Sequence, residues 1–435
     1  MAYDIVLGRD AADKERFGDR GLIYLGKGYV KMGTYTSLSN KIWLDIARSH
    51  VILIAGKRGS GKSYTLSAIA EELSSLPPEN ANNIASIIFD TMGIFWTMKY
   101  KNDKDAELLQ KWDLEAKNLP VKVFVPQGKA LIYKQKGIPV DATFALRPSE
   151  LEAGDWITLF NLNFISPPAV LIQTTISEMN ENRLSYTLQD IIDAIEQTPK
   201  AHPETKDAVI ALFKAAESWG IFARSSEGTE ITDLVNAGTT TVIDISVYSS
   251  TAAFNVRALV ISLISRKLFQ QRMDARKQEE LQAIRHGQDY LAFQSRRDPL
   301  IWMYIDEAHE FMPKEGKTPA TDALMQLLRE GRQPGISLVL ATQQPGQIHN
   351  DVLTQSDIVI SHRVTAKQDV EALNQIMQTY LLSTIKKQMD DLPSEKGSAI
   401  ILDDNSERIY SIRVRPKYTW HGGEAPASIK AEIQL

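Results

Sequence analysis

Between residues 56 and 63 the chain reads Gly56-Lys57-Arg58-Gly59-Ser60-Gly61-Lys62-Ser63, which fits the pattern G-x-x-x-x-G-K-[ST]. An apolar run over residues 51–55 precedes it and predicts a buried strand, and the pattern over residues 64–73 predicts an amphipathic helix. Glycines let backbone N–H groups and the helix N-terminus wrap around a triphosphate. We expect Lys62 to reach the β- and γ-phosphates and the Ser63 hydroxyl to bind Mg²⁺.

The octapeptide therefore predicts a nucleotide-triphosphate site, to which we add Tyr64, the residue that follows it. The alternative is a glycine-rich turn with a chance lysine. That alternative does not explain why a strand pattern and a helix pattern flank the octapeptide on its two sides.

Composition limits the classes of protein. The 435 residues are 43% apolar, enough for one large domain with appendages or for two to three domains. No apolar run reaches the roughly 18–20 residues that span a bilayer, and no secretory signal pattern is visible, so we expect no transmembrane segment and a cytoplasmic location. With no cysteine and seven scattered histidines, a zinc site is not expected. The net charge of −5 confines any nucleic-acid contact to a local surface or a ring interior.

Strand and helix patterns divide the chain into five segments. Residues 1–48 carry short β runs punctuated by glycine and predict a small N-terminal β cap, reduced and barrel-like. Residues 49–147 and 236–416 alternate strands with helices and predict the two parts of an α/β core with a mostly parallel sheet. Residues 148–235 show helical periodicity and predict an all-helical insertion. Residues 417–435 are expected to form a C-terminal tail.

An apolar strand over residues 301–306 ends in two carboxylates, Asp306 and Glu307. At the carboxyl end of a parallel strand they face the crevice in which phosphates bind. We expect Asp306 to hold Mg²⁺ and Glu307 to orient or deprotonate the attacking water. An acidic pair also occurs by chance after a strand, but beside a phosphate-binding loop it favours a hydrolase over a kinase or a passive binder.

Two further polar residues end predicted strands. Asp90 follows the apolar run 85–89 and is either a second acidic residue near Mg²⁺ or a turn residue. Gln343 follows the strand expected over 336–342. Its amide could bond a γ-phosphate oxygen and the lytic water, or it could simply begin a polar loop.

Arginines supply candidates for stabilising transition-state charge. Arg332 lies on the glycine-flanked loop 330–335, which suits insertion into a neighbouring subunit's active site. The alternative is a solvated arginine at a helix end, and Arg329 is a nearby competitor. Arg48, just before the strand that leads to the octapeptide, is a weaker candidate for reaching the nucleotide of its own chain.

Six motifs occur in a fixed order: G-K-R-G-S-G-K-S, I-I-F-D-T-M-G, Y-I-D-E-A-H, L-L-R-E-G-R-Q-P-G, L-A-T-Q-Q-P and R-V-T-A-K-Q-D-V-E-A-L. As a set they resemble the HerA/FtsK superfamily, and most closely its HerA-type ATPases, over roughly residues 45–100 and 236–416. The resemblance implies a RecA-like core in a homo-hexameric ring that moves double-stranded DNA through its pore. It places an arginine finger at Arg332 and a sensor glutamine at Gln343. It also implies a partner, the nuclease NurA in archaeal members or an effector subunit in antiphage complexes.

The chain departs from the family pattern in two places. The segment before the octapeptide is 55 residues long, shorter than the usual N-terminal barrel. Ile94 stands where the family carries an acidic residue after D-x-x-G. Both departures bear on the surface that docks a NurA-type partner more than on ATP hydrolysis.

A ring motor needs loops whose basic residues follow DNA phosphates without reading bases. We nominate Lys314 and Lys317 on the loop 312–319, with ordinary solvated charge as the alternative. Two other functions remain open. One is a conjugation, secretion or DNA-import motor at a membrane machine, and the other is a nucleotide-gated scaffold for an effector subunit.

Overall fold

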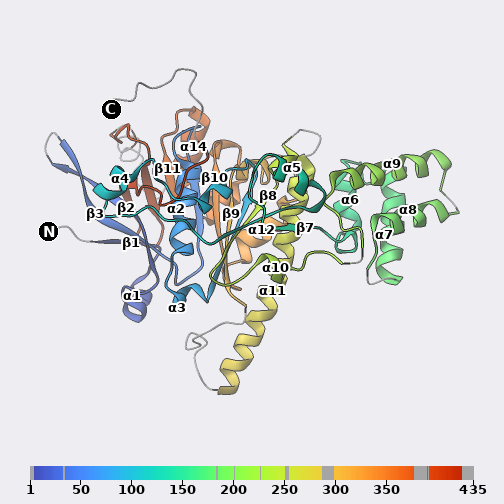
Figure 1. Cartoon of the computed structure of the whole chain (residues 1–435), viewed down its shortest axis with the longest axis horizontal. Coiled ribbons are helices and arrows are strands. Elements are labelled where there is room, and N and C mark those ends of the chain that lie inside the picture. The colour runs from blue at the N-terminus through green and yellow to red at the C-terminus, as the bar shows by residue number, and fades with distance from the viewer. Residues whose placement is uncertain are drawn as a thin grey trace.

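The computed structural model describes residues 4–32, 35–182, 185–199, 201–225, 227–249, 254–286, 298–376, 389 and 391–423. One 13-stranded sheet runs through these residues (Figure 1). In sheet order its strands are β1 (Ile5–Leu7), β3 (Tyr35–Asp45), β2 (Leu22–Met32), β13 (Arg408–Val414), β12 (Ser398–Asp403), β11 (Ile358–His362), β4 (Val51–Ala55), β10 (Ile336–Thr342), β9 (Leu300–Ile305), β5 (Ile84–Asp90), β8 (Thr240–Asp244), β6 (Val121–Pro126) and β7 (Ala142–Phe144).

The sheet is parallel from β11 to β7, and the hairpin of β12 and β13 continues it in antiparallel pairing. This confirms the α/β class with a mostly parallel sheet. The core strands expected from the apolar runs at 51–55, 85–89, 301–306 and 336–342 are present as β4, β5, β9 and β10, with ends shifted by no more than one residue. Buried parallel strands read as continuous apolar runs, which is why the sequence locates them well.

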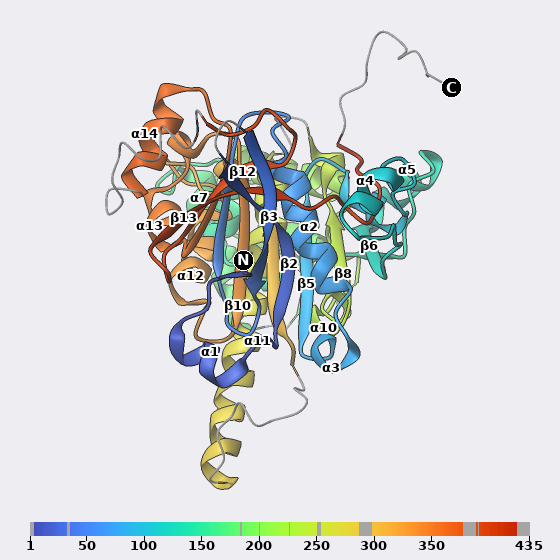
Figure 2. The ribbon, with the colours of Figure 1, turned by 90° about the vertical axis from the view of Figure 1, so that its left-hand side faces the viewer.

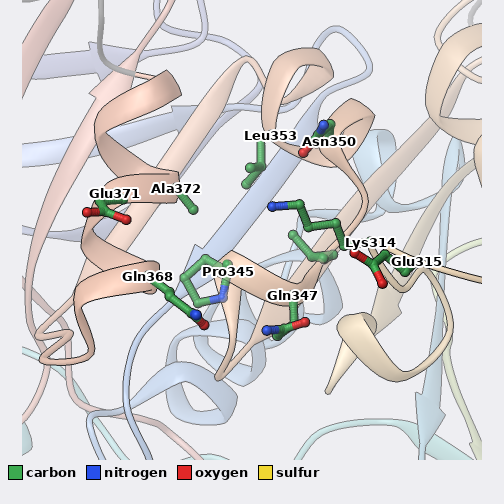
Figure 3. Close-up of a pocket in the computed structure, with 11 residues that line it drawn as sticks. Lys314, Glu315, Pro345, Gln347, Asn350, Leu353, Gln368, Glu371 and Ala372 are labelled. Carbon is green, nitrogen blue, oxygen red and sulfur yellow. The ribbon is translucent and has the colours of Figure 1, made fainter.

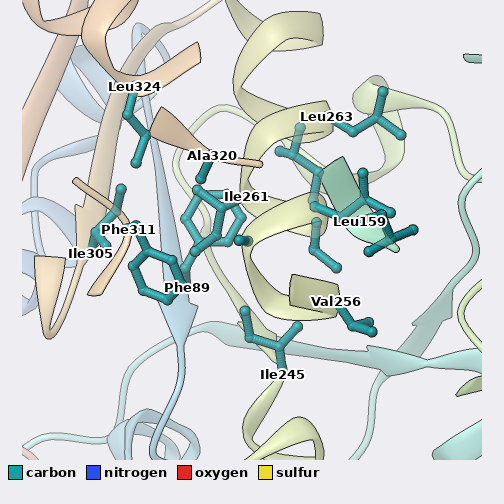
Figure 4. Packing of buried hydrophobic residues seen from close by; sticks show 14 of the residues in the cluster. Phe89, Leu159, Ile245, Val256, Ile261, Leu263, Ile305, Phe311, Ala320 and Leu324 are labelled. Atoms are coloured by element: carbon teal, nitrogen blue, oxygen red, sulfur yellow. The ribbon is translucent and has the colours of Figure 1, made fainter. Parts of the chain in front are cut away.

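Helices cover both faces of the sheet. Along β4, Val51 and Leu53 belong to one hydrophobic cluster, while Ile52 and Ile54 belong to a second cluster on the opposite face. The helix α2 (Lys62–Ser74) packs on the second cluster, and α11 (Phe254–His286) and α12 (Thr321–Glu330) pack on the first (Figure 2). Figure 4 shows side chains of α11 against β5 and β9 in the first cluster. The α2 helix is thereby fixed at the end of β4.

Outside the segment between β7 and β8, the other described α-helices are short or lie at the periphery. They are α1 (Ala11–Phe17), α3 (Pro78–Ala81), α4 (Ala106–Lys111), α5 (Ala130–Gln135), α13 (Asn350–Gln355) and α14 (Lys367–Ile376). None of the described helices is both long and apolar enough to cross a membrane.

The N-terminal strands extend the central sheet. β2 and β3 form a long hairpin, and β2 pairs with β13 through the register Ile412↔Gly28 and Val414↔Gly26. Gly26 and Gly28 lie inside β2, so the glycines expected to separate short β runs do not interrupt this strand. The edge of β13 offers backbone partners that join the hairpin to the core sheet, and the assignment of residues 1–48 to a small β cap stays a prediction.

Between β7 and β8 the described chain forms five α-helices, of which Figure 1 shows the first four on the side of the molecule away from the N-terminus and the last beside α11. They are α6 (Ala153–Leu159), α7 (Pro167–Asn182), α8 (Leu188–Gln197), α9 (Pro203–Trp219) and α10 (Ile231–Leu234). Their packing centres on the buried Trp156, whose ring centroid lies 4.9 Å from that of Phe213 and 5.1 Å from that of Phe222. The boundaries of this insertion at 148 and 235, like those of the other segments, stay predictions.

A buried network of ion pairs and hydrogen bonds holds the residues after β13 against α2. Glu71 on α2 accepts hydrogen bonds from Arg415 Nη1 and from the backbone N–H groups of Tyr418 and Thr419, each at 3.0 Å. The side chains of Arg415 and Glu71 are fully buried, and Lys417 Nζ lies 3.9 Å from Glu71. The start of the expected tail is therefore part of the core, while residues 424–435 lie outside the described residues.

Replacing Glu71 with Gln should destabilise the fold. The change keeps the shape of the side chain but removes one of the two carboxylates paired with the buried Arg415, the other being Glu72 at 2.8 Å from Nε, and removes the carboxylate nearest Lys417. Breaking a buried ion pair in this way costs about 3–5 kcal/mol. Urea unfolding followed by circular dichroism measures the effect. The control is Glu79→Gln on the exposed surface of α3, which should change stability by less than about 0.5 kcal/mol. Equal stability of the two variants would contradict a structural role for the network.

Candidate nucleotide site

The candidate site lies where three neighbouring parallel strands end. β10 lies between β4 and β9, with Thr342 opposite Ala55 and Leu340 opposite Ile305. The residues after these strands therefore emerge at one edge of the sheet. They are the glycine-rich loop, Asp306 with Glu307, and Gln343.

The loop 56–63 has the backbone geometry that a phosphate site needs. Gly61 has φ 113°, which L side chains rarely adopt, and it caps α2 so that the helix N-terminus opens onto the loop. A Cβ at Gly56 would stand 2.5 Å from Ser60 Oγ and 2.7 Å from His362 Cβ, so only glycine fits there. Lys57, Arg58 and Gly59 are exposed, which leaves the loop open to a ligand.

Lys62 is held inside the loop. Its side chain is buried, and Nζ donates to the backbone oxygen of Lys57 at 3.3 Å. Burial lowers the pKa of Lys62, and the nearby charges of Glu307 and Asp306 act in the opposite direction. An ammonium group held among carboxylates at the mouth of a helix is suited to meet the β- and γ-phosphates.

Ser63 and Asp306 meet although they are 243 residues apart in the sequence. Ser63 Oγ donates to Asp306 Oδ2 at 2.6 Å. Burial raises the pKa of Asp306, and the negative charge of Glu307 raises it further. A hydroxyl and a buried carboxylate are the oxygen donors that Mg²⁺ prefers, so the donor set fits this ion. Ser63 and Asp306 would hold it.

Glu307 and Gln343 also contact each other. Gln343 Nε2 donates to Glu307 Oε1, and the backbone N–H of Glu307 donates to Asp306 Oδ1 at 2.9 Å. The other oxygen, Oε2, is buried and accepts no hydrogen bond from the described residues. His309 Nδ1 lies 3.6 Å from this oxygen and 3.1 Å from Thr342 Oγ1, and burial lowers the pKa of His309.

One oxygen of Glu307 is thus fixed by an amide, while the other remains available as an acceptor. Sequence reasoning does not predict the contacts of His309 and Thr342. The only signal for His309 is its place three residues after Asp306.

Asp90 serves the turn after β5. Its carboxylate accepts backbone N–H groups of Met92 at 3.2 Å, Gly93 at 2.7 Å and Phe95 at 2.8 Å. Burial and the charge of Asp244, its neighbour on β8, raise the pKa of Asp90 to about 7. Of the two alternatives for Asp90, the contacts favour the turn residue, because both carboxylate oxygens are occupied by the backbone.

Tyr64 lies on the first turn of α2, directly after Ser63. Its hydroxyl accepts the backbone N–H of Lys417 at 2.7 Å, and its ring meets that of His421 edge-on at 5.2 Å between centroids. Tyr64 thus ties the C-terminal segment to the loop helix. Its contact with the nucleotide stays a prediction.

Arg48 lies at the wrong edge for the role expected of it. It precedes β4, whereas the glycine-rich loop follows β4, and a five-residue strand is about 17 Å long. Its guanidinium is paired with Asp13, at 2.8 Å from Nε and 2.7 Å from Nη2. The prediction that Arg48 reaches the nucleotide of its own chain is therefore wrong.

Arg332 lies at the same edge as Arg48, before β10. Its Nη2 is 3.2 Å from the backbone oxygen of Gln355 and 3.1 Å from Asp357 Oδ1, and its side chain is 48% exposed. The competing Arg329 is 58% exposed and pairs with Asp351 at 2.5 Å. Neither arginine can act on the nucleotide of its own chain, since the length of the sheet separates them from the loop.

Lys314 and Lys317 lie on a loop close to Gln343. Lys314 N–H donates to the oxygen of Gln347 at 2.8 Å, and its side chain lines a cavity of about 280 Å³ with Gln368 and Glu371 (Figure 3). Lys317 is exposed and pairs with Asp322 at 2.8 Å. Lys314 is therefore held against the segment that follows Gln343, and the contact of either lysine with DNA stays a prediction.

Comparison with known proteins identifies similar chains. The model of the family described as "Helicase HerA, central domain" matches residues 30–268, more than half of the chain. The chain is 26% identical over 147 residues to the DNA double-strand break repair helicase HerA of Pyrococcus furiosus, covering 32% of this chain and 24% of that protein. It is 35% identical over 69 residues to the probable DNA double-strand break repair helicase HerA of Methanocaldococcus jannaschii, covering 16% and 14%. The match thus spans less than a quarter of either relative.

Among solved structures, VirB4 of Thermoanaerobacter pseudethanolicus is similar over 92% of this chain and 97% of that chain, with a TM-score of 0.55 and 13% identity. At this identity the likeness concerns the fold alone. It confirms the RecA-like P-loop core that the motifs imply.

Replacing Lys62 with Ala should abolish ATP binding. Wild-type protein should melt at a higher temperature with Mg²⁺ and ATP, because a ligand that binds only the folded state stabilises it by about 2.7 kcal/mol at 100 times its Kd. The variant should show no such shift in a thermal unfolding assay, whereas Lys111→Ala, an exposed lysine on α4, should keep it. An undiminished shift in the Lys62 variant would contradict the assignment of the loop.

Proposed function

Because the chain belongs to the HerA helicase central-domain family, we propose that it is an ATP-hydrolysing motor that moves double-stranded DNA through the pore of a homo-hexameric ring. The observation that carries the proposal is the joint placement of Ser63, Asp306 and Glu307 at the carboxyl edge of the sheet. Each lies beside a loop built to hold phosphates, and Glu307 keeps one buried oxygen uncommitted.

In this proposal the chain's own residues divide the work of hydrolysis. The loop amides and Lys62 bind the phosphates, and Ser63 and Asp306 hold Mg²⁺, which neutralises charge on the phosphate oxygens when bound. Gln343 holds Glu307 Oε1 and so orients the carboxylate. Glu307 Oε2 then accepts a proton from the attacking water.

Arg332 supports the multimeric part of the proposal. It lies at the amino edge of the sheet, away from the loop of its own chain, and is half-exposed. An arginine that faces outward at that edge can stabilise phosphate charge only on a neighbouring subunit. A closed ring would give every subunit one such neighbour.

Several features support DNA as the substrate. The curated relatives are named as DNA repair helicases, although that name concerns those proteins. The net charge of −5 suits contact through a few residues lining a pore, for which Lys314 and Lys317 are the candidates. A NurA-type nuclease, or an effector subunit in a defence complex, is the corresponding class of partner, and the cytoplasm the corresponding location.

Replacing Glu307 with Gln should lower ATP turnover by about 10²–10⁴-fold while nucleotide binding persists, because a positioned general base is lost. Wild-type turnover should rise when duplex DNA is added. A coupled ATPase assay measures both effects, and Glu107→Gln on the exposed face of α4 is the matched control. If duplex DNA neither raises turnover nor binds, the motor is of the secretion type or the protein is a nucleotide-gated scaffold.

Replacing Arg332 with Ala should leave ATP binding intact and lower turnover by about 10³-fold or more, the size of an arginine-finger effect. Mixing this variant with Glu307→Gln should restore part of the activity. Some hybrid interfaces then combine an intact Glu307 with an intact Arg332 from the next subunit. Arg329→Ala, which removes the neighbouring exposed arginine, is the control and should remain active. Complete absence of recovery in mixed rings would argue against action between subunits.

A further inference from the structure

Arg332 is anchored by one nitrogen. Both of its recorded contacts, to the Gln355 oxygen at 3.2 Å and to Asp357 Oδ1 at 3.1 Å, involve Nη2. Nε and Nη1 make no hydrogen bond with the described part of the chain. A guanidinium carries five N–H donors in a rigid plane. Contacts to Nη2 therefore fix that plane, and the N–H donors of Nε and Nη1 remain available.

The carboxylate that holds Arg332 is itself buried and fixed. Asp357 is 8% exposed and lies directly before β11. Its Oδ1 accepts the backbone N–H of Val51 at 2.7 Å, and its Oδ2 lies 2.6 Å from His50 Nδ1. Both partners lie at the start of β4, the strand whose other end carries the glycine-rich loop.

His50 completes the support. Its ring is 2% exposed, and Nε2 lies 3.3 Å from Asp45 Oδ2. Burial alone would lower the pKa of His50, but the hydrogen bonds to Asp357 and Asp45 outweigh it and raise the pKa to about 9. Asp45 is paired in turn with the buried Arg9, whose Nε is at 2.8 Å. A charged imidazole thus links two carboxylates and leaves Asp357 little freedom.

We propose that Asp357 and His50 are positioning residues for Arg332, which they hold with its free donors directed at the nucleotide of a neighbouring subunit. This inference rests on the proposed action of Arg332 between subunits. Neither residue touches the nucleotide, and both act through the guanidinium. A long arginine side chain otherwise samples many rotamers, and holding it beforehand removes the entropy cost of ordering that side chain during the reaction.

The test is a double-mutant cycle on basal ATP turnover. Asp357→Asn keeps the shape and an oxygen for Val51 N–H but removes the charge that holds Arg332. We expect kcat to fall about tenfold, the size of one charge-assisted contact, with KM for ATP unchanged within about twofold. In the Arg332→Ala background the same change should produce no further loss.

Further variants guard against a folding defect. A cooperative thermal unfolding transition should show that Asp357→Asn is folded. Asp357→Glu restores the charge and should recover part of the ATP turnover. His50→Asn places an uncharged amide near the position of Nδ1, and we expect about a threefold fall that also disappears in the Arg332→Ala background. Asp351→Asn, at the carboxylate that pairs with Arg329, is the control and should leave turnover unchanged.

Each outcome distinguishes this inference from the proposed function. Losses that multiply in the double variant would show that Asp357 acts on stability or on another group, and would overturn the inference alone. A rise in turnover for Asp357→Asn would mean that Asp357 restrains Arg332 in an inactive position. That result would also overturn the inference and leave the proposed function standing. If Arg332→Ala itself leaves turnover unchanged, the action between subunits and this inference both fall. Stimulation by DNA plays no part in the cycle.

Discussion

The structure depends on the parallel register of β4, β10 and β9. These strands are neighbours in the sheet, and their carboxyl ends meet at one edge. The contact between Ser63 and Asp306 at 2.6 Å is a direct consequence, because only this strand order brings the two residues together. The apolar clusters on both faces hold the register, since a slip of one residue would turn every buried side chain of a strand to the other face.

The same strands give the subunit two chemically different edges. Carboxylates, an amide and the glycine-rich loop gather at the carboxyl edge, where the helix dipole of α2 adds positive potential. Arginines gather at the amino edge, held by Asp13, Asp351 and Asp357. The loop and Lys62, which would bind the phosphates, and the exposed arginines are thus separated within one chain. That separation is why the proposed pocket is completed by a second copy.

The sequence predicts the core well for a physical reason. Buried parallel strands leave continuous apolar runs, and a phosphate loop needs glycine at fixed positions, so β4, β9 and β10 can be located from the residues alone. Asp306 and Glu307 follow from the end of an apolar run. The contact of Gln343 with Glu307 needs the strand order as well, which periodicity does not report.

Other features could not be predicted because their partners are distant in sequence. Glu71 and Arg415 look like ordinary surface charges until the chain after β13 is laid on α2. Asp90 is a turn residue through hydrogen bonds that depend on backbone geometry. Arg48 precedes the correct strand but lies at its opposite end, a distinction of direction that a motif spacing does not contain.

β4 has a consequence for how an assembled ring would run. The phosphate loop follows one end of this strand. At the other end, His50 and the Val51 N–H form hydrogen bonds with the Asp357 carboxylate. The strand is central, hydrogen-bonded on both sides and five residues long, so a shift at one end is transmitted to the other with little bending. In the proposed ring, nucleotide bound at one end of β4 would then bear on the position of Asp357 and, through it, of Arg332 at the other end.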